Sequence, residues 1–274
     1  MKLGAMQGRL VKREIKSRMQ SFPWKNWKKE FKLLDQLGIR NLEWTLDYKN
    51  FFNNPINTKK GCNEITKLKR KYKVNLNSLT ADFFMQKPIF KKKFKNFEAD
   101  MLNKIKYLIK NCNLVGIRYI VFPLVDNSSI KNKYEIKNLI LFLKKIELTL
   151  EKYKVQILFE SDFEPRKLLS FIKRINKKYF GINYDTGNST ALQYDFNKEM
   201  NYYKFIKNVH LKDRSFNGSS KKFGMGKTNF DEIKNFLKKK KYNGNLIFQS
   251  ALPLNKNPIG EFNHNLNFIK KLIK

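Results

Sequence analysis

Residues 155–185, VQILFESDFEPRKLLSFIKRINKKYFGINYD, contain one complete strand, helix and strand pattern. Residues 155–160 and 180–185 are mostly apolar runs, and each ends in a carboxylate, Glu160 or Asp185. The segment between them, residues 165–175, begins with a proline and carries apolar residues at helical spacing. Buried parallel strands read as such apolar runs, and a helix is their usual connection. The pattern predicts two parallel strands that present their carboxylates at the same edge of a sheet.

The same unit recurs along the whole chain, and no linker rich in Pro, Gly or Ser divides it. Eight units in 274 residues give about 34 residues each, which suits a (β/α)8 barrel of about 250 residues. We therefore predict an α/β fold, a single-domain (β/α)8 barrel over residues 1–274. A doubly wound open sheet is the alternative, but neither G-x-G-x-x-G nor G-x-x-x-x-G-K-[ST] follows the first strand. The predicted strands are residues 3–6, 41–46, 74–80, 119–125, 155–160, 180–185, 207–211 and 245–249, and the predicted helices are residues 24–37, 64–72, 97–116, 136–153, 165–175, 197–206, 231–240 and 262–273.

The composition limits the class of protein. With 41% hydrophobic residues, 12 Gly and 7 Pro, the chain can bury one large core and is neither disordered nor collagen-like. No apolar run approaches the roughly 18 residues of a membrane span, and the start MKLGAMQGRL lacks the apolar stretch of a signal peptide. We therefore expect a cytoplasmic protein without a membrane partner. The two cysteines, Cys62 and Cys112, are interpreted as reduced, partly buried side chains.

The formal net charge of +35 ordinarily points to a polyanion such as nucleic acid. Of the 58 basic residues, 9 are Arg, and the other 49, all Lys, accompany abundant Asn, Ile, Phe and Tyr, which share A/T-rich codons. Genome composition is a sufficient cause of this excess. Arg is the residue that grips guanine and phosphate through two hydrogen bonds, and it is scarce here. We therefore expect no nucleic-acid partner.

Polar residues follow the predicted strands at the point where each strand ends. Active sites of (β/α)8 barrels lie at the carboxyl ends of the strands, so these side chains are expected to meet in one pocket. They are Gln7 and Arg9, Glu43, Thr80 and Asp82, Asp126, Glu160, Asp185, His210 with Lys212, and Gln249.

Four of these residues come from four consecutive strands and suggest a metal site. Glu160, Asp185, His210 and Gln249 offer two carboxylates, one imidazole and one amide oxygen. Such oxygen and nitrogen ligands without thiolate suit one divalent ion of Mn, Mg, Co or Zn. An ion of this kind polarises a carbonyl and stabilises an enediolate, which lowers the barrier to removing a proton next to that carbonyl.

These residues lie in strings that resemble, in order, the xylose isomerase-like TIM barrels described as sugar-phosphate isomerases and epimerases. The strings are LEWT, SLTADFFM, VFPLVDNSS, LFESD, NYDTGNS, VHLKDR, GMGKTNF and FQS. Relatives of this group include ketose 3-epimerases, hydroxypyruvate isomerase and, more distantly, endonuclease IV. In the epimerases, a Glu, an Asp, a His and a Glu that end strands five to eight bind the metal. The resemblance thus implies that Glu160, Asp185 and His210 are ligands of a metal-dependent sugar or sugar-phosphate isomerase or epimerase.

The chain departs from this pattern at two positions. Gln249 stands where the epimerases have their second glutamate, and an amide cannot take a proton. Asn188 stands where the relatives tend to have a histidine. The departures favour a one-base isomerisation with Glu160 as the base over a two-base epimerisation. Glu43, Asp82 or Asp126 could replace the missing acid.

The remaining site residues are expected to act on the substrate. Lys212 is predicted to be catalytic together with Glu160, and Arg9, Lys212, Arg214 and Lys227 are expected to recognise a phosphate or carboxylate. The string GMGKTNF, residues 224–230, offers backbone N–H groups that could meet such an anion. The predicted substrate-binding residues are Arg9, Glu43, Asp82, Asp126, Asn188, Arg214 and Lys227.

Other interpretations stay open at this point. Asp185 could be a helix cap, His210 a core histidine, and Gln249 a donor to a ligand rather than a ligand. A sugar-binding barrel without catalysis is an alternative function, and an endonuclease IV-like nuclease acting on abasic DNA is a second one. The nuclease is disfavoured because its trinuclear zinc centre needs several histidines, whereas this chain has two, of which His264 is interpreted as a surface residue. We also consider a homodimer.

Overall fold

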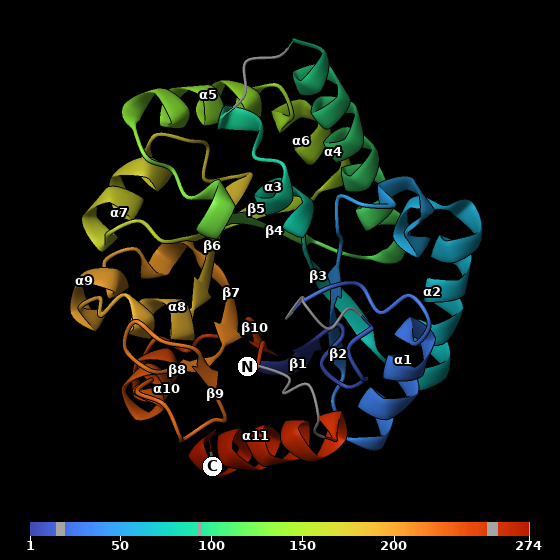
Figure 1. Cartoon of the computed structure of the whole chain (residues 1–274), viewed down its shortest axis with the longest axis vertical. Helices are drawn as coiled ribbons and strands as arrows, with labels where there is room; N and C mark the ends of the chain where they lie inside the picture. The colour runs from blue at the N-terminus through green and yellow to red at the C-terminus, as the bar shows by residue number, and fades with distance from the viewer. Residues whose placement is uncertain (15–19, 92–94, 251–256, 274) are drawn as a thin grey trace.

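Eight parallel strands close into a barrel in the computed structural model, which describes residues 1–14, 20–91, 95–250 and 257–273 (Figure 1). Neighbouring strands follow the order β1-β10-β7-β6-β5-β4-β3-β2, and the ring closes between β2 and β1. The predicted (β/α)8 barrel is confirmed. The barrel strands are β1 (Lys2–Met6), β2 (Asn41–Thr45), β3 (Asn75–Thr80), β4 (Tyr119–Leu124), β5 (Gln156–Ser161), β6 (Phe180–Asp185), β7 (Ile206–Leu211) and β10 (Asn245–Phe248).

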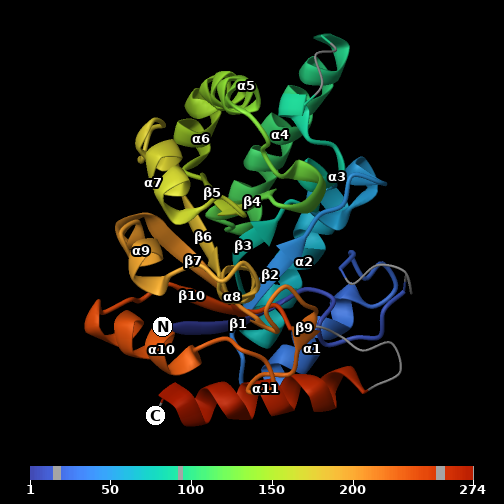
Figure 2. The ribbon, with the colours of Figure 1, turned by 60° about the vertical axis from the view of Figure 1, so that its left-hand side comes forward.

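Helices surround the barrel on the outside, as the two views in Figures 1 and 2 show. The α-helices are α1 (Trp27–Gln36), α2 (Lys59–Tyr72), α3 (Asp82–Gln86), α4 (Lys95–Val115), α5 (Lys133–Lys144), α6 (Glu147–Tyr153), α7 (Pro165–Lys173), α8 (Thr186–Ala191), α9 (Phe196–Met200), α10 (Phe230–Lys239) and α11 (Pro258–Ile273). Short 3-10 turns are η1 (Phe51–Asn53), η2 (Pro55–Asn57), η3 (Ile89–Lys91), η4 (Asp126–Ser128) and η5 (Tyr203–Phe205), and a small antiparallel pair is formed by β8 (Asp213–Arg214) and β9 (Ser220–Lys221).

Side chains alternate along each barrel strand, and this alternation separates the site from the core. On β6, Tyr184 faces outward and reaches Glu199 of α9, whereas Asn183 faces inward and reaches Glu160 of β5. The outward positions carry large apolar side chains that pack under the helices. Phe159 of β5, for example, lies edge-on to Phe171 of α7, with ring centroids 5.2 Å apart. The inward positions near the carboxyl ends are left to polar residues.

Four of the predicted helices are wrong in extent, and two of them, over residues 64–72 and 262–273, begin five and four residues too late. The helix predicted over residues 136–153 is two helices, α5 and α6, because Ile146 is fully buried and the chain tightens into i to i+3 hydrogen bonds at Lys145 and Ile146. The helix predicted over residues 197–206 ends early, since α9 gives way to η5 and β7 already begins at Ile206. In addition, the sequence analysis missed α8, which follows β6 directly.

Two expectations from composition can be compared with the structure. Cys62 and Cys112 are buried free thiols, in agreement with the sequence interpretation. In the part of the chain that the structure describes, no helix combines the length and apolar character that crossing a membrane requires.

Candidate metal centre

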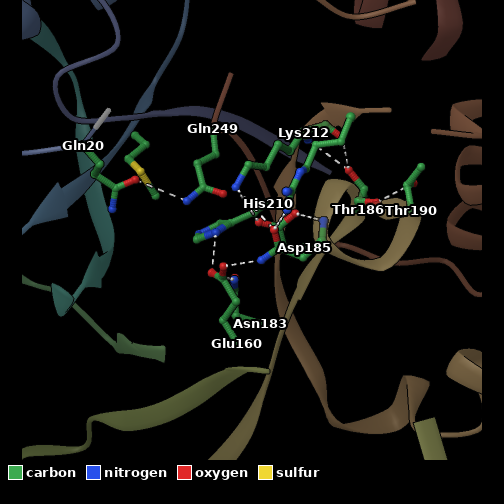
Figure 3. A network of polar contacts seen from close by, with 12 residues as sticks. Gln20, Glu160, Asn183, Asp185, Thr186, Thr190, His210, Lys212 and Gln249 are labelled. Carbon is green, nitrogen blue, oxygen red and sulfur yellow. Dashed lines mark hydrogen bonds and ion pairs between the residues drawn. The ribbon is translucent and has the colours of Figure 1, made fainter. Parts of the chain in front are cut away.

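Glu160, Asp185 and His210 meet inside the carboxyl-terminal end of the barrel (Figure 3). Their potential ligand atoms all lie within 4.8 Å of one another, and none of the three residues is more than 5% exposed. The strand register explains the meeting, because Asp185 of β6 is the direct partner of His210 of β7. The three residues are therefore held by adjacent strands rather than by loops.

The His210 ring is oriented by a buried carboxylate behind it. Its Nε2 lies 2.7 Å from Oε1 of Glu43, and its Nδ1 lies 3.0 Å from Oε2 of Glu160. Glu43 also accepts hydrogen bonds from the hydroxyls of Ser78 at 2.6 Å and Thr80 at 2.8 Å. Burial raises the pKa of Glu43, but His210 and the two hydroxyls outweigh it and bring the pKa below its ordinary value. Glu43 is thus an anion that fixes the ring from the rear.

The carboxylates on either side of the His210 ring stabilise a positive charge at that position. Burial by itself lowers the pKa of His210, but Glu43 and Glu160 raise it to about 10. A cation is therefore stabilised between these carboxylates, whether it is the imidazolium proton or a metal ion that replaces it. With Nε2–H donated to Glu43, the lone pair of Nδ1 is directed towards Glu160 and Asp185, as in many metal sites whose histidines are oriented by a carboxylate.

Two asparagines that the sequence analysis missed complete a hydrogen-bonded ring. Asn183 donates from Nδ2 to Oε2 of Glu160 at 3.0 Å, and Asn208 donates to Oδ1 of Asn183 at 2.7 Å and to Oε2 of Glu43 at 3.0 Å. Each asparagine stands two residues before a predicted ligand, Asp185 or His210, so it faces the same side of its strand. The signal was a polar residue inside an otherwise apolar strand.

Gln249 lies directly after β10 and has a free amide oxygen. Its Nε2 donates to Oε1 of Gln20 at 3.3 Å, whereas its Oε1 is buried and has no hydrogen-bond partner within the described ranges. An unpartnered buried oxygen is costly unless something else satisfies it. Together with two carboxylates and one imidazole, it forms a donor set that fits a divalent cation with a preference for oxygen and nitrogen. The residues present therefore fit the implied metal.

Lys212 and Arg214 converge on Asn188 beside the ligand cluster. Lys212 Nζ lies 3.5 Å from both Oδ2 of Asp185 and Oδ1 of Asn188, and Nη1 of Arg214 donates to the same Asn188 oxygen at 3.0 Å. Asn188 in turn donates to Oε1 of Glu160 at 2.9 Å. Asp185 also caps α8 by accepting the Asn188 backbone N–H at 2.8 Å, and burial raises its pKa. The cap interpretation of Asp185 is thus confirmed, and it is compatible with a ligand role.

Arg9, Gln20 and Asp82 form a second polar group at the same end of the barrel. Arg9 donates to Oε1 of Gln20 at 2.9 Å, and Gln20 donates to Oδ2 of Asp82 at 2.7 Å. Burial lowers the pKa of Arg9 to about 10, and burial together with the charge of Asp47 raises the pKa of Asp82 to about 7. Because Gln249 donates to Gln20, this group is connected to the candidate metal ligands.

Glu30 of α1 holds the loop that carries Arg9, and the sequence analysis did not identify it. Its Oε1 accepts the backbone N–H groups of Gly8 at 2.8 Å and Leu10 at 3.3 Å. Burial raises the pKa of Glu30 to about 8. A lone glutamate on an amphipathic helix gives no sequence signal for this role.

Asp126 and Lys227 are not brought into the described contacts of the cluster. Asp126 begins the turn η4 after β4. Lys227 donates its backbone N–H to the Arg214 carbonyl and lines a separate cavity of about 270 Å³ on the outside of β6, beside Tyr194 and Phe216. Among the described residues, neither side chain is hydrogen-bonded to Glu160, whose oxygens accept from Asn183 and Asn188.

The loop that was expected to bind an anion, residues 224–230, donates its N–H groups to a carboxylate of the protein itself. The backbone N–H groups of Gly224, Gly226 and Thr228 donate to the carboxylate of Asp213, at 2.9, 2.9 and 3.1 Å. The prediction that these N–H groups meet a substrate anion is therefore wrong. The physical reason is that Asp213, buried after β7, already supplies the negative charge that they need.

The chain resembles known proteins in sequence pattern and in fold. A family model described as "Xylose isomerase-like TIM barrel" matches residues 31–272. No curated protein sequence shows significant similarity to the chain.

Solved structures with the same fold include three of similar size. The IOLI protein with a bound zinc atom has a TM-score of 0.79 at 15% identity, covering 100% of this chain and 98% of that chain. D-Psicose 3-epimerase with D-tagatose from Clostridium cellulolyticum H10 has a TM-score of 0.77 at 12% identity, with 100% of both chains covered. The 3-keto-D-glucoside 4-epimerase YcjR from E. coli has a TM-score of 0.74 at 14% identity, with 99% of both chains covered. At these identities the similarity establishes the fold.

Proposed function

Since the chain belongs to the xylose isomerase-like TIM barrel family, we propose that it is a metal-dependent isomerase or epimerase of a sugar or sugar phosphate. One observation carries the proposal. Glu160, Asp185 and His210 bring buried ligand atoms within 4.8 Å of one another, and the buried Oε1 of Gln249, which has no hydrogen-bond partner among the described residues, is available as a fourth donor. The names of the similar structures, among them a ketose 3-epimerase and a ketoglucoside 4-epimerase, support a sugar as the substrate.

Glu160, Asp185, His210 and Gln249 would hold one divalent ion of Mn, Mg, Co or Zn. When bound, such an ion supplies Lewis-acid polarisation of the substrate carbonyl, which acidifies the neighbouring C–H bond. Glu43 holds the His210 ring in the tautomer that leaves Nδ1 available. Asn183 and Asn208 fix the spacing between the two glutamates on either side of that ring.

Glu160 is the proposed base. Burial raises its pKa, but His210 and Lys212 outweigh burial and bring the pKa below its ordinary value, so the carboxylate is ionised at neutral pH. Hydrogen bonds from Asn183 and Asn188 hold its two oxygens in place. A positioned carboxylate of this kind removes the proton from the carbon next to the substrate carbonyl.

Lys212 and the arginines are the proposed groups for substrate oxygens. Asn188 contacts both Lys212 Nζ and Oε1 of Glu160, so Lys212 lies close to the proposed base. It can donate a proton or a hydrogen bond to a substrate oxygen near the reacting carbon. Arg214 and Arg9 add two more cations at the same end of the barrel. This charge favours a substrate with a phosphate or carboxylate group.

Activity with defined sugars tests the proposal. The protein is stripped with a chelator, reloaded with Mn²⁺, and assayed on D-psicose, D-tagatose, D-fructose and D-fructose 6-phosphate. We expect activity on at least one of these sugars that depends on the metal, and a fall in kcat of about 10²–10⁴-fold in Glu160→Gln. Glu151→Gln, which removes an exposed partner of Lys178, is the matched control and should retain full activity. Full turnover by the metal-free protein would contradict the proposal.

A sugar-binding barrel without catalysis is the second candidate, because Gln249 cannot carry a proton. Binding of D-tagatose by the Mn²⁺-loaded protein, with no exchange of any carbon-bound proton in D₂O, would favour it. The nuclease alternative gains no support. His264 is exposed on α11 and lies 3.3 Å from the Phe223 carbonyl, so His210 is the single histidine of the described cluster.

A further inference from the structure

The candidate site has one evident base for a proton bound to carbon, and no evident second group for proton transfer to carbon, because Lys212 is placed to serve substrate oxygens. Glu160 comes from β5, and the residue that follows the last barrel strand, Gln249, is an amide. Three other carboxylates follow or lie within the strands near this end, namely Glu43, Asp82 and Asp126. Their surroundings differ enough to separate them.

Glu43 has a structural role, because both of its oxygens are already hydrogen-bonded. It is fully buried, and its two oxygens accept hydrogen bonds from Ser78, Thr80 and Asn208 and contact the His210 ring. Its pKa lies below the ordinary value, so it holds no proton to give. Since His210 stands between Glu43 and the ligand cluster, a substrate would have to displace the ring to reach this carboxylate.

Asp126 is placed in a turn rather than in the site. It is the first residue of η4, with a φ of +50°, and its side chain is exposed. The backbone N–H of Ser129 donates to its carbonyl. Within the described ranges, no hydrogen bond joins its carboxylate to Gln20, Gln249 or Glu160.

Asp82 lies at the mouth of the barrel, in the half that carries none of the candidate metal ligands. It follows β3, which is four strands from β7 in either direction around the closed barrel and two strands from β5, the strand of Glu160. It is 4% exposed, and Gln20 connects it to Gln249 by hydrogen bonds of 2.7 and 3.3 Å. This chain of side chains crosses from the half of the barrel without ligands to the half that contains them, as its Gln20 to Gln249 part shows in Figure 3.

On this geometry, and resting on the proposed function, we propose that Asp82 is the second proton carrier, which makes the protein a two-base epimerase. Asp82 replaces the acid that Gln249 cannot be. The catalytic pair is then Glu160 from β5 and Asp82 after β3, instead of residues from β5 and the last strand.

The groups around Asp82 suit this role. Burial raises its pKa, as do the charges of Asp47 and Glu160, whereas the hydrogen bond from Gln20 and the charge of Arg9 lower it. The balance is a pKa of about 7, so both protonation states are populated at neutral pH. General acids and bases work best when their pKa lies near the working pH.

The proton balance of the step is closed. Ionised Glu160 takes the proton from the carbon next to the carbonyl, and the electron pair of that C–H bond forms a C=C bond while the carbonyl pair moves to oxygen. Protonated Asp82 then gives its proton to the same carbon from the opposite side, and the oxygen pair re-forms the carbonyl. Glu160 ends protonated and Asp82 ionised, and proton exchange with water resets both.

The deciding experiment separates proton removal from proton return. Wild type, Asp82→Asn and Glu160→Gln, each loaded with Mn²⁺, are incubated in D₂O with the sugar of the panel that wild type converts. NMR follows deuterium entering the recovered substrate and the formation of the epimer. Asp231→Asn, which changes a side chain that is 73% exposed on α10, is the matched control and should behave as wild type.

We expect Asp82→Asn to exchange the substrate proton at a rate close to wild type while epimer formation falls by about 10²–10⁴-fold. Glu160→Gln should lose both. Epimerisation at the wild-type rate by Asp82→Asn would overturn the inference and leave the proposed function intact. Loss of both exchange and epimer in a folded, Mn²⁺-binding Asp82→Asn would also overturn it. Absence of any conversion or exchange by wild type would overturn the proposed function itself.

A wild-type measurement covers the case in which Asp82→Asn does not fold. Substrate deuterated at the reacting carbon is converted in H₂O, and the epimer is examined for retained deuterium. Two bases predict an epimer that carries only solvent hydrogen at that carbon. Transfer of the substrate deuterium into the product, or formation of an aldose instead of an epimer, would indicate a single base and contradict the inference.

Discussion

At the scale of single residues, the buried carboxylates of the site have different surroundings, and these give them different roles. Glu43 is ionised and orients the His210 ring, and Glu160 is ionised and belongs to the ligand cluster. Burial raises the pKa of Asp82 to about 7. Glu30 is a fourth case, in which a buried acid supports a loop. Strand ends in the sequence identified the first three, but could not assign these roles, because each role depends on contacts between strands.

Glu43→Gln is expected to weaken metal binding. The amide no longer stabilises the tautomer in which Nε2–H of His210 points backwards, and such supporting changes typically cost about 10–100-fold in metal affinity. Titration calorimetry with Mn²⁺ measures the dissociation constant, and Glu151→Gln is again the control. An unchanged affinity for Mn²⁺ in a folded Glu43→Gln protein would show that metal binding does not depend on the contact between Glu43 and His210.

Glu30 gives a prediction about pH. Its pKa is raised from 4.5 to about 8, so between these values the folded protein keeps a proton that the unfolded chain releases. The contribution of Glu30 to the free energy of unfolding is therefore full below about pH 4.5 and falls as the pH rises to about 8. Urea unfolding between pH 5 and 8 should show a shallower decline in Glu30→Gln than in wild type. Parallel curves would contradict the assignment.

At the scale of elements, short loops after the strands set the positions of the site residues. Asp185 ends β6 and is the N-cap of α8, and the loop after β7 is organised by Asp213. The apolar runs predicted every barrel strand to within about two residues, because burial on both faces leaves a continuous signal. Helix ends were less predictable, as at Ile146, because they depend on which side chains become buried against the barrel. The sequence also could not show that the N–H groups of residues 224–228 donate to Asp213, because that contact depends on the folded loop.

Asp213→Asn is expected to loosen the loop at residues 224–228. The amide has one acceptor oxygen in place of two, so at least one of the donors Gly224, Gly226 and Thr228 loses its partner. A buried donor left unsatisfied costs about 1–3 kcal/mol, which chemical unfolding measures as a lower free energy of unfolding. Ser215→Ala, a nearby change without a carboxylate, is the control. A stability equal to wild type would show that Asp213 does not organise the loop.

At the scale of the whole molecule, the closed order of strands divides the site into two halves. β5, β6, β7 and β10 bring the candidate ligands, and the opposite half brings Asp82 through β3 and Arg9 through β1. The sequence predicted this convergence because strand ends of a parallel barrel share one edge. It did not identify Asn183 and Asn208, although each is a polar residue inside an otherwise apolar strand, and it could not predict the bridge through Gln20, because the sequence around Gln20 has no periodic pattern.

The most direct test of the central claim is an anomalous-scattering map from crystals of the full chain grown with Mn²⁺. We expect a single strong peak at bonding distance from the side chains of Glu160, Asp185, His210 and Gln249, and its loss in His210→Ala. A map from diffracting, Mn²⁺-soaked crystals without a peak among these four side chains would contradict the metal centre and the chemistry proposed for it.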